Sequence, residues 1–239
     1  MSVFTRTLAL VALVGGAAAG PAAAATFGSD FTLGAEDWTA VAVANDLSLV
    51  TPIYNLPVSA NPPVVHVATG GNPGGRITVT DPNADWTHFV APAAFLGNQA
   101  ALYGGSLSYD MQQQANGGLF INGPNVALVG TNGTVLVYGS NNPPPEAPAW
   151  KHYDVPFATD AAGWFVGSVF GPAATGTQLS SVLGSLQALL INAEFANQIA
   201  EVTSLDNVRF TTNPASVPLP PAILGFAAAL GLLRARRRV

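Results

Sequence analysis

The sequence contains no cysteine, and charged side chains make up only 9% of its 239 residues. The lack of cysteine excludes disulfide bonds, thiolate metal sites, a cysteine nucleophile and anchoring through a lipidated cysteine. Glycine and proline contribute 25 and 19 residues, a composition that favours short strands joined by turns over long helices. We therefore expect one all-β domain that is stable without covalent cross-links.

Basic residues are nearly absent from the middle of the chain. All thirteen acidic residues lie between Asp30 and Asp206, and the only basic residues of the middle region, 26–212, are Arg76, Lys151 and Arg209. A region so acidic repels the phosphate backbone of nucleic acids, so we expect no nucleic-acid partner. The negative charge of this region is better suited to binding cations than to binding nucleic acids.

Residues 1–25 have the three parts of a secretory signal peptide. Arg6 lies in a short positive region, "LALVALVGGAAAG" is the apolar stretch, and the small residues of "PAAAA" suit signal peptidase. Cleavage is expected near Ala24 or Ala25. The alternative, an uncleaved N-terminal membrane helix, is disfavoured because the apolar stretch is short.

Residues 213–239 contain a proline turn, an apolar run and a basic end. The apolar run from Ala222 to Leu233 would form a helix of about 18 Å, which is short for a hydrocarbon core about 30 Å thick. The positive-inside rule keeps the terminal arginines in the cytoplasm and the preceding domain outside. Those arginines are Arg234, Arg236, Arg237 and Arg238. We expect this helix to associate with the membrane.

The tail resembles the PEP-CTERM class of sorting signals. The resemblance rests on "VPLPPA" at 217–222, which is similar to the VPLPA variant with one additional proline. The motif residues are Val217, Pro218, Leu219, Pro220 and Pro221. The resemblance implies processing by an exosortase-type membrane enzyme, and a location at the cell surface, in the outer envelope or in the extracellular matrix. A plain single-pass tail anchor is the alternative.

Residues 26–212 consist of short apolar or alternating runs separated by turn signals. Strands are expected in "WTAVAV", "RITVT", "GSLSYDM", "NVALVG", "VLVYGS", "KHYDVPF" and "NVRF". Asn132 and Gly133 predict a hairpin that pairs residues 125–130 with 134–139. The leucine spacing in 177–191 predicts an amphipathic helix that caps one end of a sandwich, followed by a strand at "LINAEF".

This middle region resembles a laminin IV (laminin B) domain of the bacterial type. The resemblance is carried by "FTLGAEDWT", "GNPGGRITVTDP", "FVAPAAFLGN", "YGGSLSYDM" and the closing "LDNVRF". It implies a jelly-roll, galactose-binding-like β-sandwich in a non-catalytic module of an extracellular protein. The long insert at 45–68 departs from the family pattern, and we expect a surface loop there.

The segment "DPNADW" offers oxygen ligands at alternate positions, as a calcium loop does. Asp81, Asn83 and Asp85 are the candidate ligands of a structural calcium ion, a metal that galactose-binding-like sandwiches often hold. The glycine and closing glutamate of an EF-hand are missing, and an Asp-Pro-Asn turn explains the same residues without a metal. Asp206 and Asn207 allow the same two interpretations.

Four aromatic residues beside polar or turn residues are candidates for stacking on sugar rings: Trp86, Trp150, Tyr153 and Trp164. The strand pattern also directs each of them into the core, and core packing is the interpretation that we favour. Trp38 is expected in the core.

Catalytic motifs are scarce. The histidines have no metal-ligand spacing, no G-x-S-x-G elbow occurs, and "GGNPGG" at 70–75 is a turn because neither a lysine nor a helix follows it. We therefore expect no enzyme activity. The leading hypothesis is an exported surface or matrix protein that binds extracellular polysaccharide. A purely structural matrix unit and a polysaccharide hydrolase are the alternatives.

Overall fold

The computed structural model describes residues 24–44, 57–114, 123–139, 142–196 and 200–213. Within these ranges the chain forms two antiparallel sheets with one short α-helix, which confirms the expected all-β sandwich. The predicted signal peptide and sorting tail lie outside the described residues. None of the described helices is long and apolar enough to cross a membrane.

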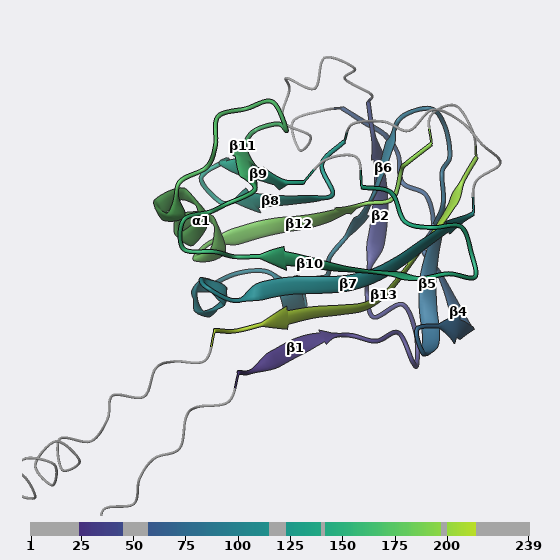
Figure 1. Cartoon of the computed structure of the whole chain (residues 1–239). Helices are drawn as coiled ribbons and strands as arrows, with labels where there is room; N and C mark the ends of the chain where they lie inside the picture. The colour runs from purple at the N-terminus through teal and green to yellow at the C-terminus, as the bar shows by residue number, and fades with distance from the viewer. Residues whose placement is uncertain (1–23, 45–56, 115–122, 140–141, 197–199, 214–239) are drawn as a thin grey trace, which may run out of the picture. The chain divides into compact units, whose positions relative to one another are not determined.

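The first sheet, sheet A, has the strand order β10-β7-β13-β5-β4, and β1 also pairs with β13. Its strands are β1 (Thr26–Ser29), β4 (Val65–Gly71), β5 (Gly74–Thr80), β7 (Ser106–Gln114), β10 (Lys151–Pro156) and β13 (Val202–Thr211). The long strand β13 pairs with β7 on one side and with β5 and then β1 on the other. In Figure 1 the strands β10, β7, β13 and β1 run across the lower part of the domain, and β5 and β4 stand at its right-hand side.

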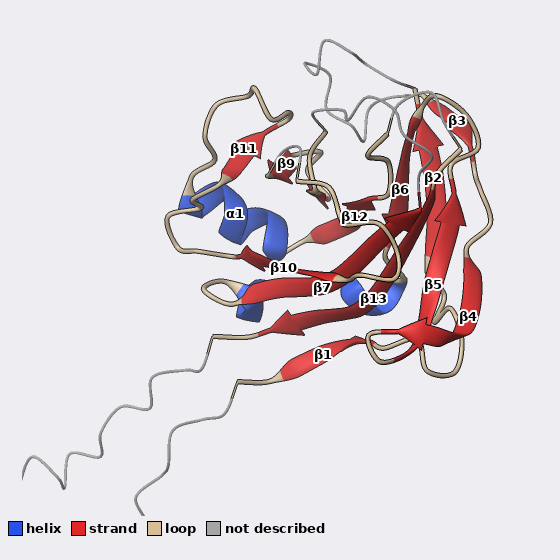
Figure 2. Ribbon diagram, turned by 45° about the vertical axis from the view of Figure 1, so that its right-hand side comes forward, coloured by secondary structure: helices blue, strands red, loops and turns tan. Residues whose placement is uncertain are grey.

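The second sheet, sheet B, has the order β11-β9-β8-β12-β6-β2-β3. Its strands are β2 (Thr39–Val43), β3 (Val58–Ala60), β6 (Trp86–Val90), β8 (Val126–Gly130), β9 (Val135–Tyr138), β11 (Trp164–Val166) and β12 (Leu186–Asn192). The predicted hairpin is confirmed, because β8 pairs with β9 around Gly133, whose φ is 79°. Figure 2 shows both sheets with helix α1 (Gly176–Leu183) at one end.

The helix predicted over 177–191 is wrong in its second half. A capping box at Thr175 starts α1, and the helix ends at Leu183. Residues 186–192 form strand β12 at the centre of sheet B instead. Both faces of this strand are buried, so nearly every position of it is apolar. A continuous apolar run contains leucines three and four residues apart by chance, which is the spacing that predicts a helix.

Part of the expected insert loop at 45–68 is also strand, because β3 and the first residues of β4 lie within it. Residues 45–56 lie outside the described residues. The turn at "GGNPGG" is confirmed, since it joins β4 to β5 as a hairpin. Two short 3-10 helices, η2 (Ala93–Phe95) and η3 (Ala100–Leu102), follow β6.

The main core lies between the two sheets and is rich in aromatic rings. Trp38 is 3% exposed, as the sequence predicts, and packs edge-on against Phe31 and Phe95. Tyr109 of β7 stacks on Tyr153 of β10 with ring centroids 4.9 Å apart. These contacts fix one face of sheet A, so the alternate residues of its strands point to the outer face.

Candidate functional site

The outer face of sheet A carries a group of polar residues that we call the polar cluster: Asn72, Asp110, His152, Asp206 and Asn207. Strand register brings three of them together, because Asp110 of β7 lies opposite both His152 of β10 and Asp206 of β13. The cluster is therefore a row across three neighbouring strands.

Two backbone features complete the cluster. The β4–β5 hairpin brings Asn72 over β13. A Cβ on Gly71 would lie 2.0 Å from the Gly75 carbonyl oxygen and 2.7 Å from Asp206 Oδ2, so only glycine fits there. A bulge in β13 between Asp206 and Arg209 places Asn207 at φ 50°. The bulge turns the Asn207 side chain toward Asp110.

Asp110 is the centre of the cluster. Its Oδ2 accepts hydrogen bonds from the side-chain amides of Asn207 at 2.8 Å and Asn72 at 3.2 Å. Its Oδ1 lies 2.6 Å from Nδ1 of His152, whose side chain is 62% exposed. This is a charge-assisted contact when the imidazole is protonated. The exposed imidazole is thus held in one orientation at the surface.

Asp206 is the buried member of the cluster. Its carboxylate accepts hydrogen bonds from the backbone N–H groups of Asn72 and, at 2.7 Å, Asn207. Burial raises the pKa of Asp206 to about 6, and the negative charges of Asp110 and Asp30 act in the same direction, against the lowering effect of the two hydrogen bonds. This carboxyl therefore changes its charge close to neutral pH.

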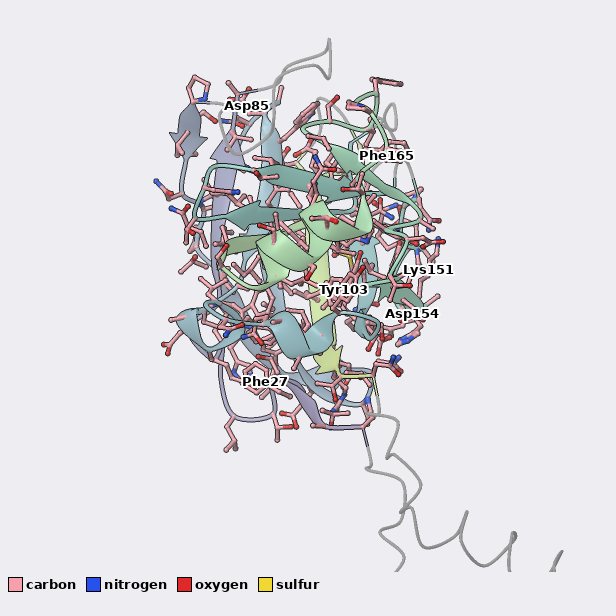
Figure 3. All side chains as sticks on the ribbon, turned by 90° about the vertical axis from the view of Figure 1, so that its left-hand side faces the viewer. Phe27, Asp85, Tyr103, Lys151, Asp154 and Phe165 are labelled. Atoms are coloured by element: carbon pink, nitrogen blue, oxygen red, sulfur yellow. The ribbon has the colours of Figure 1, made fainter. Side chains whose placement is uncertain are left out.

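A second polar row runs beside the cluster. Asp154 of β10 lies opposite Ser108 of β7, which lies opposite Arg209 of β13. Asp154 and Arg209 are exposed. Figure 3 shows Asp154 and Lys151 at one edge of the domain. Together, the two rows present carboxylate, imidazole, amide and guanidinium groups on one sheet face, a set suited to hydrogen bonding with hydroxyl groups.

The outer face of sheet B is different, because it is apolar. It carries a groove of about 900 Å³. Its apolar lining includes Val41, Val43, Val58, Val90, Ala188 and Leu190. Thr39 and Asn61 are the polar side chains that line it. The groove offers contact area but few hydrogen bonds, so it does not suit a hydroxyl-rich ligand as well as sheet A does.

The four aromatic candidates do not form one surface. Trp86 and Trp164 are 3% and 1% exposed, and the Trp164 indole donates to the Pro156 carbonyl at 2.9 Å. Tyr153 is 6% exposed, and its hydroxyl donates to the Asn142 carbonyl. Trp150 is half-buried. Tyr153 and Trp164 belong to the core between the sheets, as expected, whereas Trp86 packs in a second apolar cluster on the outer face of sheet B. Sugar stacking by these aromatic residues stays a prediction.

The candidate calcium loop follows β5. Asp81 Oδ1 accepts from the Asn83 N–H at 3.3 Å, and Asn83 Oδ1 accepts from the Asp85 N–H at 3.0 Å. These contacts are those of hydrogen-bonded turns, so the turn explains the loop without a metal. In the described ranges, no three His, Asp and Glu side chains already stand in a metal-binding arrangement.

Sequence reasoning missed most of the polar cluster. The sequence alone indicates Asp206 and Asn207 only as turn or calcium candidates, and it gives Asn72, Asp110 and His152 no shared role. Asn72 and Asn207 are 135 positions apart, so no local pattern joins them. The available signal was alternation: polar residues at every second position of a strand mark its outer face.

Comparison with solved structures gives remote matches. The L4b domain of human laminin alpha-2 matches with 15% identity and a TM-score of 0.45, over 57% of this chain and 80% of that chain. A family 11 carbohydrate-binding module of cellulase Lic26A-Cel5E of Clostridium thermocellum matches with 15% identity and a TM-score of 0.48, over 80% and 96%. The Clostridium thermocellum module in complex with a beta-1,3-1,4-mixed-linked tetrasaccharide matches with 13% identity and a TM-score of 0.43, over 82% and 99%.

No curated protein matches the chain. The family model described as Laminin B (Domain IV) matches residues 88–222, a stretch that begins in β6 and contains the three strands β7, β10 and β13 of the polar cluster. This match spans more than half of the 239 residues. The chain belongs to the laminin B (domain IV) family.

Proposed function

We propose that the sandwich is a non-catalytic binding domain for extracellular polysaccharide. The observation that carries the proposal is the outer face of sheet A, where Asp154, Arg209 and the imidazole of His152 are exposed beside the polar cluster. Carboxylate, guanidinium and imidazole groups hydrogen-bond to sugar hydroxyls in both donor and acceptor roles. Membership of the laminin B family is consistent with a binding module in an extracellular protein.

The polar cluster supports this proposal because its side chains are already ordered. Asp110 fixes His152 through the 2.6 Å contact and also holds the amide of Asn207. A site whose groups are held before the ligand arrives loses less conformational entropy on binding. We therefore infer that the polysaccharide lies along the two polar rows, across β10, β7 and β13.

The ends of the chain extend the proposal to location. Residues 1–25 direct export, and the motif at 217–222 with its apolar run and arginines directs sorting by an exosortase-type enzyme. The domain would then be displayed at the cell surface or in the matrix, with the membrane contacted through the tail before processing. We further propose that the sandwich is a jelly roll of the galactose-binding-like kind.

A glycan array and affinity electrophoresis with exopolysaccharides test the binding proposal. His152→Ala, Asp154→Ala and Arg209→Ala should each weaken binding about fivefold, since a typical hydrogen bond contributes about 1 kcal/mol. The control is Asp160→Ala, an exposed position in the loop between β10 and β11 that belongs to neither polar row. If no glycan binds the folded wild-type chain, or the three variants bind as the control does, the proposal is wrong and the structural matrix unit is favoured.

Fractionation of cells tests the sorting proposal separately. Deletion of residues 217–239 should move the protein from the envelope to the medium, and mass spectrometry of the mature protein should find both ends cut. An unchanged location after the deletion would refute the role of the tail without affecting the binding proposal.

A further inference from the structure

Three acidic side chains meet at one end of the sandwich, away from the polar cluster. Asp81 follows β5, Glu194 follows β12, and Glu201 precedes β13. The Asp81 N–H donates to the Glu201 carbonyl at 2.9 Å, which ties the first residue to the third. All three are buried, with Asp81 at 5%, Glu194 at 1% and Glu201 at 0% exposure. We call them the buried acidic triad.

The triad has oxygens that receive no hydrogen bond. Glu201 Oε1 accepts from the Phe195 N–H at 2.8 Å and from the Thr203 hydroxyl at 3.2 Å. Glu201 Oε2 and Glu194 Oε2, by contrast, are fully buried and have no donor. A buried carboxylate oxygen without a partner destabilises the folded state, because it loses its hydrogen bonds to water on folding and gains none within the protein.

No cationic side chain of the described region compensates the triad. The charges that act on Glu194 are those of Asp81 and Glu201, and the charge that acts on Glu201 is that of Asp81. Burial raises the pKa of both Glu194 and Glu201. The neighbouring negative charges raise the pKa of Glu194 further, whereas hydrogen bonds to Glu201 oppose the effect of burial on that carboxyl. The Asp81 and Glu194 side chains are hydrogen-bonded to each other, which requires a proton on one of them. The triad therefore needs either shared protons or a positive charge.

We propose that Asp81, Glu194 and Glu201 bind a divalent cation of the calcium type. The donors present are all oxygens, which hard cations prefer, and the hydroxyls of Thr87 and Thr203 lie beside the carboxyls. The carboxyls do not yet surround one point. The side chains of Glu194 and Glu201 must therefore turn their unpaired Oε2 atoms toward the ion when it binds. This inference does not depend on polysaccharide binding.

Thermal unfolding of the full chain, with calcium chloride, with magnesium chloride and with a chelator, tests the proposal. A ligand at one hundred times its Kd raises the Tm of a domain of this size by about 5–10 °C. We expect such a rise with calcium and a smaller one with magnesium, which tolerates fewer geometries. Isothermal titration with calcium should show one site per chain.

Two sets of variants separate the buried acidic triad from the loop predicted from the sequence. Glu194→Gln and Glu201→Gln should lose the calcium-dependent rise, and in chelator they should be at least as stable as the wild type because each removes a buried carboxyl. Asp85→Asn, in the loop beside Asp81, is the matched control and should keep the full rise.

The calcium response of the wild type and of the three variants decides between the buried acidic triad and the loop. Loss of the calcium response in both glutamine variants, with its retention in Asp85→Asn, supports the proposal. A wild-type chain whose Tm and titration heats ignore calcium overturns it and leaves a triad held by shared protons. Loss of the response in Asp85→Asn alone also overturns it, in favour of the loop. If the glutamine variants do not fold, the wild-type titration decides.

Discussion

The buried carboxyl of Asp206 makes a sharp prediction about how stability depends on pH. Its side chain is 0% exposed and its pKa is raised from 3.8 to about 6, chiefly by burial. Between these two values the folded chain retains a proton that the unfolded chain has released. Stability therefore falls as the pH rises from about 4 to about 6, and the loss is complete above that range.

The size of this effect follows from the shift. One pKa unit corresponds to about 1.4 kcal/mol, so ionisation of Asp206 costs the folded state about 3 kcal/mol between pH 4 and pH 7. Asp206→Asn removes the ionisation. It also leaves one carbonyl oxygen to accept from the two N–H groups of Asn72 and Asn207, at a cost of about 1 kcal/mol.

The assay is unfolding in urea, monitored by tryptophan fluorescence, at several pH values between 4 and 7.5. The variant should be less stable than the wild type by about 1 kcal/mol at pH 4 and more stable by about 2 kcal/mol at pH 7. Other buried acids are present in both chains and cancel in the difference. Asp160→Asn, on an exposed loop, should parallel the wild type. Parallel profiles for Asp206→Asn and the wild type would show that Asp206 ionises as an ordinary carboxyl, against the reasoning.

Three further substitutions test the fold. Leu189 of β12 is 0% exposed, so Leu189→Ala should lower the free energy of unfolding by about 2–5 kcal/mol. Gln187 on the same strand is exposed, so Gln187→Ala should change the free energy of unfolding by less than about 0.5 kcal/mol. Thr175→Ala removes the cap of α1 and should cost about 1 kcal/mol in urea unfolding, with a Thr175→Ser control near the wild type. Gly133→Ala places a Cβ at φ 79° and should lower the Tm by a few degrees, and an unchanged Tm would argue against the β8–β9 turn.

The sequence predicts local structure well and distant contacts poorly. The β8–β9 hairpin is predictable because its signal, Asn132-Gly133, sits between the strands that it joins. The second half of the predicted helix is wrong because β12 is buried on both faces. One face packs in the core between the sheets, and the other packs in a second apolar cluster on the outer face of sheet B. Periodicity cannot separate such a strand from a helix.

The candidate site was harder to foresee for the same reason. His152, Asp110 and Asp206 meet through the register of three strands, and strand register is set by the whole sheet. Likewise, Glu194 and Glu201 stand out only as acids within the apolar stretch from β12 to β13, and their meeting with Asp81 depends on how the two sheets close at that end.

The pairing of β1 with β13 has a mechanical consequence. Thr26 lies opposite Thr211, and the neighbouring Thr212 N–H donates to the Ala25 carbonyl at 3.0 Å, so the strands leave the sheet side by side, as Figure 1 shows. A force that pulls the first residue of β1 away from the last residue of β13 would act across the strands and break the hydrogen bonds between them one after another. The domain should then yield at low force from this edge, whereas a load directed along the strand axes would have to break several of these hydrogen bonds at once.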